Sequence, residues 1–111
     1  MDGLKRGDVV SVAASGDFAG KPRPAIVVQS DLFNPTHASV SVVPVTTTLI
    51  DADLFRVELA PSTDNGLRAR SQAMVDKVTS VRKDRVGHRV GTLSPSDLGR
   101  VDGALRVWLG L

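Results

Sequence analysis

Residues 22–29, PRPAIVVQ, place one arginine between two prolines and continue directly into a run of aliphatic residues. Each proline fixes its own φ, and a residue that precedes proline is pushed toward extended backbone. Lys21 and Arg23 both precede a proline, so both are held in extended backbone. The stretch therefore predicts a strand over residues 24–29, with a rigidly held cation, Arg23, at its start.

Strand-like composition recurs on both sides of this stretch. Residues 55–59 alternate apolar and charged side chains, which is typical of a strand with one exposed face. Asn65-Gly66 favours positive φ in a turn, so the runs before and after it should be antiparallel neighbours. The other runs with strand composition cover residues 8–13, 38–47, 69–81 and 89–92.

One helix is predicted at the end of the chain. Ser94 fits an N-cap, Pro95 the first helical position, and Asp97 the third position of a capping box. Short strands followed by one helix indicate a mostly β protein, with a small, strongly bent antiparallel sheet or partly open SH3-like barrel. The apolar stripe expected to pack on the sheet or on a partner chain comprises Leu98, Val101, Ala104, Leu105 and Trp108.

The length and composition limit the class of protein. A chain of 111 residues fits one domain, residues 1–111. No segment approaches the ~18–20 apolar residues of a membrane span, and the first residues lack the apolar core of a signal peptide, so we expect a cytoplasmic protein. The absence of cysteine excludes disulfides, thiolate nucleophiles and thiolate-bound metals.

The basic residues are concentrated in one part of the chain. The net charge is only +2, but residues 68–90 hold seven of the 14 lysines and arginines and two of the 12 acids. Such a segment suggests a polyanionic or acidic partner, and the alternative is a solvated strand edge. The candidates to contact a polyanion in a salt-dependent way, and to bind RNA if the polyanion is a nucleic acid, are Lys21, Thr47, Arg68, Arg70, Lys77, Arg82, Lys83 and Arg85.

Several common chemistries have no support in the sequence. The two histidines lie far apart, and Asp51 with Asp53 is a weak indication of a metal site, so we expect no metal or other cofactor. No phosphate loop, dinucleotide fingerprint or nucleophile elbow is present. Stacking platforms for bases are also scarce: Phe18 and Phe33 are the candidates outside the helix, and either could instead belong to the core.

The remaining candidates for a functional site are polar residues at the ends of the predicted strands. A guanidinium is a fixed fork of donors that matches phosphate bidentately, and the prolines around Arg23 lower the entropy cost of using it. The alternative is an ordinary surface arginine. Thr46 and the two threonines after it follow an apolar run and can donate to an anion, although threonine is also common in strands for packing alone.

Five blocks, in order and spacing, resemble one known family. They are RGDVV (residues 6–10), GKPRPAIVVQSDLFN (20–34), VVPVTT (42–47), NGLRARSQAMVDKV (65–78) and GTLSPSDLGRVDGAL (91–105). Over residues 6–111 the chain is similar to the MazF/PemK toxins of type II toxin-antitoxin systems. The resemblance implies a bent-sheet barrel with a C-terminal helix, a homodimer, cleavage of single-stranded RNA without metal, and inhibition by a MazE-like antitoxin.

The resemblance also implies site residues. Arg23 falls on the arginine of the family's R-P motif and Thr46 on the first threonine of its T-T pair, the two positions used in catalysis. Asp76 matches an acid that in some members assists proton transfer or positions substrate. Some relatives carry an arginine two residues before that acid, where this chain has Met74.

The implied reaction is attack of an RNA 2'-hydroxyl on its own phosphate, which leaves a 2',3'-cyclic phosphate and a 5'-hydroxyl. Arg23 suits the stabiliser and acid, whereas arginine is a poor base and neither His37 nor His88 lies in a matching motif, so the base stays unassigned. Two alternatives remain open: a gyrase poison of the CcdB type, to which the ending VWLGL is similar, and a non-catalytic barrel that binds RNA or antitoxin.

Overall fold

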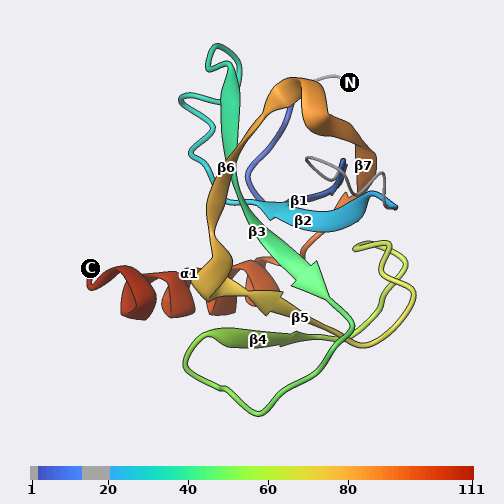
Figure 1. The fold of residues 1–111 in the computed structure, drawn as a ribbon, viewed down its shortest axis with the longest axis vertical. Helices are drawn as coiled ribbons and strands as arrows, with labels where there is room; N and C mark the ends of the chain where they lie inside the picture. The colour runs from blue at the N-terminus through green and yellow to red at the C-terminus, as the bar shows by residue number, and fades with distance from the viewer. Residues whose placement is uncertain (1–2, 14–20) are drawn as a thin grey trace.

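A computed structural model describes residues 3–13 and 21–111 of the chain (Figure 1). In these residues the chain forms an antiparallel sheet and a C-terminal helix, as the sequence predicts. The strands are β1 (Asp8–Val12), β2 (Arg23–Val27), β3 (Ser39–Thr46), β4 (Arg56–Leu59), β5 (Ser71–Met74), β6 (Thr79–Arg82) and β7 (Val86–Thr92). Two 3-10 turns, Val75–Lys77 and Lys83–Arg85, interrupt the second half, and α1 covers Pro95–Leu109.

The sheet bends strongly but does not close. Its strand order is β4-β5-β3-β2-β1-β7, and β6 pairs with the other end of β3. Figure 1 shows β1, β2, β3, β6 and β7 curling around one end of the molecule, with β4, β5 and α1 at the other. Among the described strands, β4 and β7 end the order, so the sheet is an open version of the barrel that the sequence predicts.

Strands β2 and β3 are buried on both faces and separate two apolar cores. Ile26 and Val43, which are paired, face a core shared with α1. Val27 and Val42, the next pair, face a second core inside the curled strands. Continuous aliphatic runs are what a doubly buried strand requires, and this explains the unbroken apolar runs at residues 24–28 and 42–45, whereas the first half of β3, residues 39–42, alternates serine and valine.

Helix α1 begins at the predicted N-cap, Ser94, but the Asp97 side chain bonds to Arg100 and does not complete the predicted capping box. The backbone N–H of Asp97 donates to the Ser94 hydroxyl at 3.0 Å, and Gly110 closes the helix at φ 72°. The carboxylate of Asp97 accepts from Arg100 at 2.7 Å. Val101 is fully buried against the sheet, whereas Trp108 stays 49% exposed and meets the ring of Phe55 with 6.2 Å between centroids.

No helix in the described residues is long and apolar enough to cross a bilayer.

The predicted strand over residues 69–81 is wrong in one respect: it is two strands joined by a 3-10 turn. Thr46 pairs with Gln72 of β5, but Val42 pairs with Thr79 of β6, three residues later than the β5 register would put it. The turn Val75–Lys77 takes up those three residues where β3 bends. Val75 is a residue type that is common in strands, so the sequence of this turn does not itself indicate an interruption.

The loop of residues 60–70 between β4 and β5 is built around Asn65. Strands β4 and β5 are antiparallel neighbours, as the Asn65-Gly66 pair predicts, and Gly66 has φ +71°. The buried Asn65 side chain accepts from the N–H groups of Ser62 and Leu67 and donates to the Ala60 carbonyl, all within 3.0 Å. The N–H of Thr92 donates to the carbonyl of Asp64, so the loop is fastened onto β7.

Replacing Asn65 by alanine should lower the free energy of unfolding by about 2–4 kcal/mol, because three side-chain hydrogen bonds at a buried position are lost. Urea titration followed by circular dichroism measures the change. Asp64→Ala, at the exposed neighbour, is the control and should shift stability by no more than about 0.5 kcal/mol. An equal effect of the two substitutions would contradict the role given to the Asn65 side chain.

Candidate functional site

Arg23 and Thr46 lie where β2 begins and β3 ends. The ladder pairs Val27 with Val42 and stops at Ala25 with Pro44, so Arg23 and Thr46 are the residues two positions beyond its last pair. Alternate residues of a strand share a face of the sheet, so Arg23 follows Ala25 and Thr46 follows Pro44 on one face. Two residues that are 23 positions apart in the sequence therefore lie at the same end of the β2–β3 pairing.

Arg23 lines a small apolar hollow, which we call the Arg23 hollow. It measures about 200 Å³, and Arg23 is the charged residue among those that line it in the described chain. Arg23 itself is exposed, and its backbone pairs with Val12 of β1. The other lining residues are Val12, Ala13, Pro24, Ala25, Val42, Pro44, Thr79 and Val81. A cation held over an apolar floor keeps its donors free for a ligand from solvent.

The chain after Thr46 is fixed by hydrogen bonds from Gln72 and Arg56, which we call the latch. The N–H of Thr48 donates to the Thr46 hydroxyl at 3.0 Å. Gln72, which pairs with Thr46 and is buried, accepts from the N–H of Ile50 and donates to its carbonyl, at 3.1 and 2.9 Å. Arg56 donates to both the Thr48 carbonyl and the Gln72 side chain. The threonine at the strand end thus has a fixed backbone on both sides.

A second and larger hollow lies beside the first. It measures about 520 Å³, shares Pro24 with the Arg23 hollow, and is lined by Thr47, the residue after Thr46. Three residues predicted to bind RNA meet here, Lys21, Thr47 and Arg68. The remaining lining residues are Ser11, Pro22, Gly66, Leu67, Ala69, Ser71, His88 and Val90. We call this cavity the side hollow.

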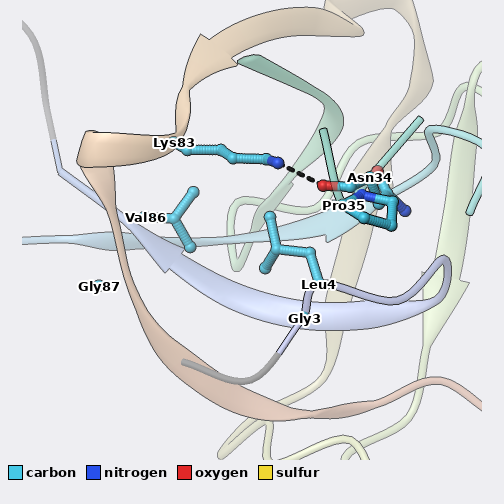
Figure 2. A pocket seen from close by; sticks show the side chains of 7 residues that line it. All are labelled: Gly3, Leu4, Asn34, Pro35, Lys83, Val86 and Gly87. Carbon is cyan, nitrogen blue, oxygen red and sulfur yellow. Dashed lines mark hydrogen bonds between the residues drawn. The ribbon is translucent and has the colours of Figure 1, made fainter. Parts of the chain in front are cut away.

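The other predicted RNA-binding cations are dispersed. Arg70 contacts Glu58 at 2.6 Å, and this hydrogen bond holds the pKa of the Glu58 carboxyl below its usual range. Arg82 contacts Asp84 at 2.9 Å. Lys83 points to the backbone carbonyl of Asn34 across a separate cavity of about 380 Å³ (Figure 2). None of these three residues lines the Arg23 hollow or the side hollow.

Arg85 and Lys77 lie in the two 3-10 turns. The carbonyl of Arg85 accepts from the N–H of Ala13 at 2.9 Å, which brings its backbone next to the end of β1 where Arg23 pairs. Lys77 is exposed in the turn before β6, away from the residues that line either hollow.

Asp76 also lies in the turn before β6, outside the lining of both hollows. Its Oδ1 atom is buried and has no hydrogen-bond partner within the described residues. Arg23 and Thr46 thus lie just beyond the last β2–β3 pair, whereas Asp76 lies on the other flank of β3, where β5 gives way to β6. Of the two candidate stacking residues, Phe33 is half exposed in a turn and Phe18 lies outside the described residues.

Possible metal ligands do not converge in the described part of the chain, where no group of three His, Asp or Glu side chains could hold an ion. Asp51 and Asp53 line a shallow hollow together with Arg56 and Arg70. Glu58 lines the same hollow and is the ion-pair partner of Arg70.

Residues with no motif of their own complete the site. Gln72 and Arg56 fix the chain after Thr46, and Ser11 with His88 lines the side hollow. Gln72 could have been noticed in the sequence as a polar residue inside a strand-like run. Its partners could not, because they depend on the register between β3 and β5.

Comparison with known proteins assigns the family. A family model described as PemK-like, MazF-like toxin of type II toxin-antitoxin system matches residues 5–109. The chain belongs to this family. It is 46% identical over 108 residues to a probable endoribonuclease MazF of Mycolicibacterium smegmatis, with 97% of this chain and 98% of the relative covered. It is 31% identical over 116 residues to endoribonuclease MazF9 of Mycobacterium tuberculosis, with the same coverage.

Solved structures of the PemK/MazF toxins share the fold. A mycobacterial endoribonuclease in complex with its cognate antitoxin superposes with a TM-score of 0.79 at 26% identity, covering 100% of this chain and 97% of the other. A MazE-MazF complex from Deinococcus radiodurans reaches 0.81 at 21% identity, covering 97% of this chain and 96% of that one, and at this identity shows the fold alone.

Gln72→Leu should loosen the chain after Thr46 without unfolding the sheet, because leucine fills the space but offers no partner to the Ile50 backbone. Exchange of the Ile50 amide, measured by NMR, should accelerate by roughly fivefold or more, since one such hydrogen bond contributes ~1 kcal/mol. The Val43 amide in the middle of β3 is the internal control. Equal acceleration at both amides would show general destabilisation and contradict the latch.

Proposed function

We propose that this chain is the endoribonuclease toxin of a type II toxin-antitoxin pair and that it cleaves single-stranded RNA at Arg23 and Thr46. One observation supports the proposal: the β2–β3 ladder stops two residues short of both side chains, so that β2 begins at Arg23 and β3 ends at Thr46 on the same face. The family membership and the endoribonuclease relatives give the reaction class. The side hollow next to this pair offers space for a neighbouring nucleotide.

The proposed reaction uses the substrate's own nucleophile. The RNA 2'-oxygen loses its proton and bonds to the adjacent phosphorus, and the bond from phosphorus to the 5'-oxygen breaks. The products are a 2',3'-cyclic phosphate and a 5'-hydroxyl, whose oxygen takes up a proton. No atom is required from a metal-bound water or a cysteine, in keeping with the residues at hand.

Charge stabilisation is the task that the site residues suit. Negative charge grows on the non-bridging phosphate oxygens as the 2'-oxygen bonds, and a pre-positioned donor gains strength as it does so. Arg23 supplies a forked cation on extended backbone, and the Thr46 hydroxyl supplies a second donor from the facing strand. The latch through Gln72 limits how far that hydroxyl can move.

The regulatory setting follows from the relatives. One solved relative is an endoribonuclease in complex with its cognate antitoxin. We propose that this chain, too, is held inactive by a MazE-like antitoxin, that it acts as a homodimer in the cytoplasm, and that it cuts at preferred sequences. Lys21, Thr47 and Arg68 around the side hollow are the described residues best placed to hold RNA beside the cut.

Arg23→Ala should lower the cleavage rate by at least ~100-fold, because one well-placed donor to a developing oxyanion is worth about that much. Mapping of 5'-hydroxyl ends on a long defined RNA measures it, with circular dichroism to confirm folding. Arg106→Ala, at an exposed arginine on α1, is the matched control and should cleave normally. A folded Arg23 variant with full activity would overturn the assignment. Gyrase-dependent DNA breaks, or RNA binding without cuts, would point to the poison or to the binder.

Addition of EDTA should leave the cleavage rate unchanged, because the nucleophile and the charge stabilisation are proposed to come from RNA, Arg23 and Thr46. The same end-mapping assay, run with and without the chelator, measures this. Activity that disappears with EDTA and returns with a divalent cation would reject the proposed mechanism.

A further inference from the structure

Strand β7 carries a bulge directly opposite Ser11. Val10 pairs with Arg89 and Val12 pairs with Val86, so the single residue Ser11 faces two residues, Gly87 and His88. A bulge of this kind redirects the side chains beside it and occurs frequently next to active sites. Here the His88 side chain is directed into the side hollow, which it lines together with Ser11.

The Ser11 hydroxyl contacts both the backbone and the imidazole ring of His88. It accepts from the backbone N–H of His88 at 3.0 Å and lies 3.2 Å from the His88 Nδ1 atom. A serine hydroxyl has one O–H and two lone pairs, so it can accept from the His88 N–H and also donate its own hydrogen to Nδ1. In that arrangement the neutral ring carries its proton on Nε2, which has no hydrogen-bond partner in the described part of the chain and offers a donor to the hollow.

Gly87 makes this arrangement possible. A Cβ atom at position 87 would come within 2.5 Å of the Ser11 hydroxyl oxygen. Any side chain there would push the hydroxyl away from the imidazole. The Ser11–His88 pair is therefore packed into the strand pairing and is more than a chance contact between exposed side chains.

The side hollow has the character of a site for a flat, partly apolar group. Its volume of about 520 Å³ lies within the ~300–1,000 Å³ typical of ligand pockets. Pro22, Pro24, Leu67 and Val90 supply apolar walls, and His88 supplies a directional donor. A nucleobase matches this pattern, because its faces are apolar and its edge carries hydrogen-bond acceptors.

We propose that His88 is a specificity-determining residue, which donates from Nε2 to an acceptor on the edge of a nucleobase held in the side hollow. The inference rests on the proposed function and deepens it by assigning a base-reading residue. The base belongs to a nucleotide next to the cut, because Arg23 lines the neighbouring hollow across Pro24 and does not line this one. His88 is accordingly separate from the charge stabilisation at the phosphate.

The experiment compares cut sites of three variants with those of the wild-type protein. His88→Leu removes the donor, and His88→Gln keeps an N–H in a similar place. His37→Leu changes the other histidine, which is exposed in a turn and lines neither hollow. Each protein cleaves the same long RNA of mixed sequence, and the 5'-hydroxyl ends are mapped to give the base preference at each position around the cut.

We expect His88→Leu to weaken the preference at one position by roughly two- to tenfold, the worth of one hydrogen bond, while preferences elsewhere persist. His88→Gln should keep a clear preference there, and His37→Leu should match the wild type. A merely structural role would slow all cuts alike, and this result, or an unchanged preference at every position in His88→Leu, would overturn the inference. Lack of cleavage by the wild type would instead overturn the proposed function.

Discussion

The burial of β2 and β3 on both faces is the constraint on which the rest of the structure depends. One face of the pair packs with Ile26 and Val43 toward α1, and the other packs with Val27 and Val42 into the curled sheet. A slip by one residue would exchange the two sets of side chains, so the register is strongly specified. The same register decides where the pairing of the two strands ends, and so two apolar cores determine that Arg23 and Thr46 lie just beyond its last pair.

The candidate site lies where the hydrogen-bonded pairing of β2 and β3 ends. The N–H of Val28 donates to Ser41, but Pro24, two hydrogen-bonding steps further along β2, has no N–H to offer. Beyond that point the strands are held by their other neighbours: β2 by β1, and the end of β3 by β5 and the Gln72 latch. The Arg23–Thr46 pair thus sits at an opening between strands that are each fixed from the outer side.

The features that could be predicted are those determined by residues close together in the sequence. The helix followed from Ser94 and Pro95, the β4–β5 pairing from Asn65-Gly66, and the extended backbone of Arg23 from its flanking prolines. The turn inside residues 69–81, the bulge opposite Ser11 and the latch through Gln72 were not predictable. Each depends on the offset between strands distant in sequence, and that offset is set by packing and not by the residues at the site.

The meeting of the two ends of the chain has a consequence for synthesis on the ribosome. Arg6 forms an ion pair with Asp102, β1 pairs with β7, and the core beneath β2 and β3 needs Val101 of α1. A nascent chain that ends before residue 86 already contains Arg23 and Thr46, yet β1 lacks its outer partner and the core lacks its helix. Contacts this distant in sequence form only when the last elements have emerged. The complete sheet and its core therefore form only after α1 has been synthesised, and a partly synthesised copy carries Arg23 and Thr46 without the outer strand β7 and the helix that support β1, β2 and β3.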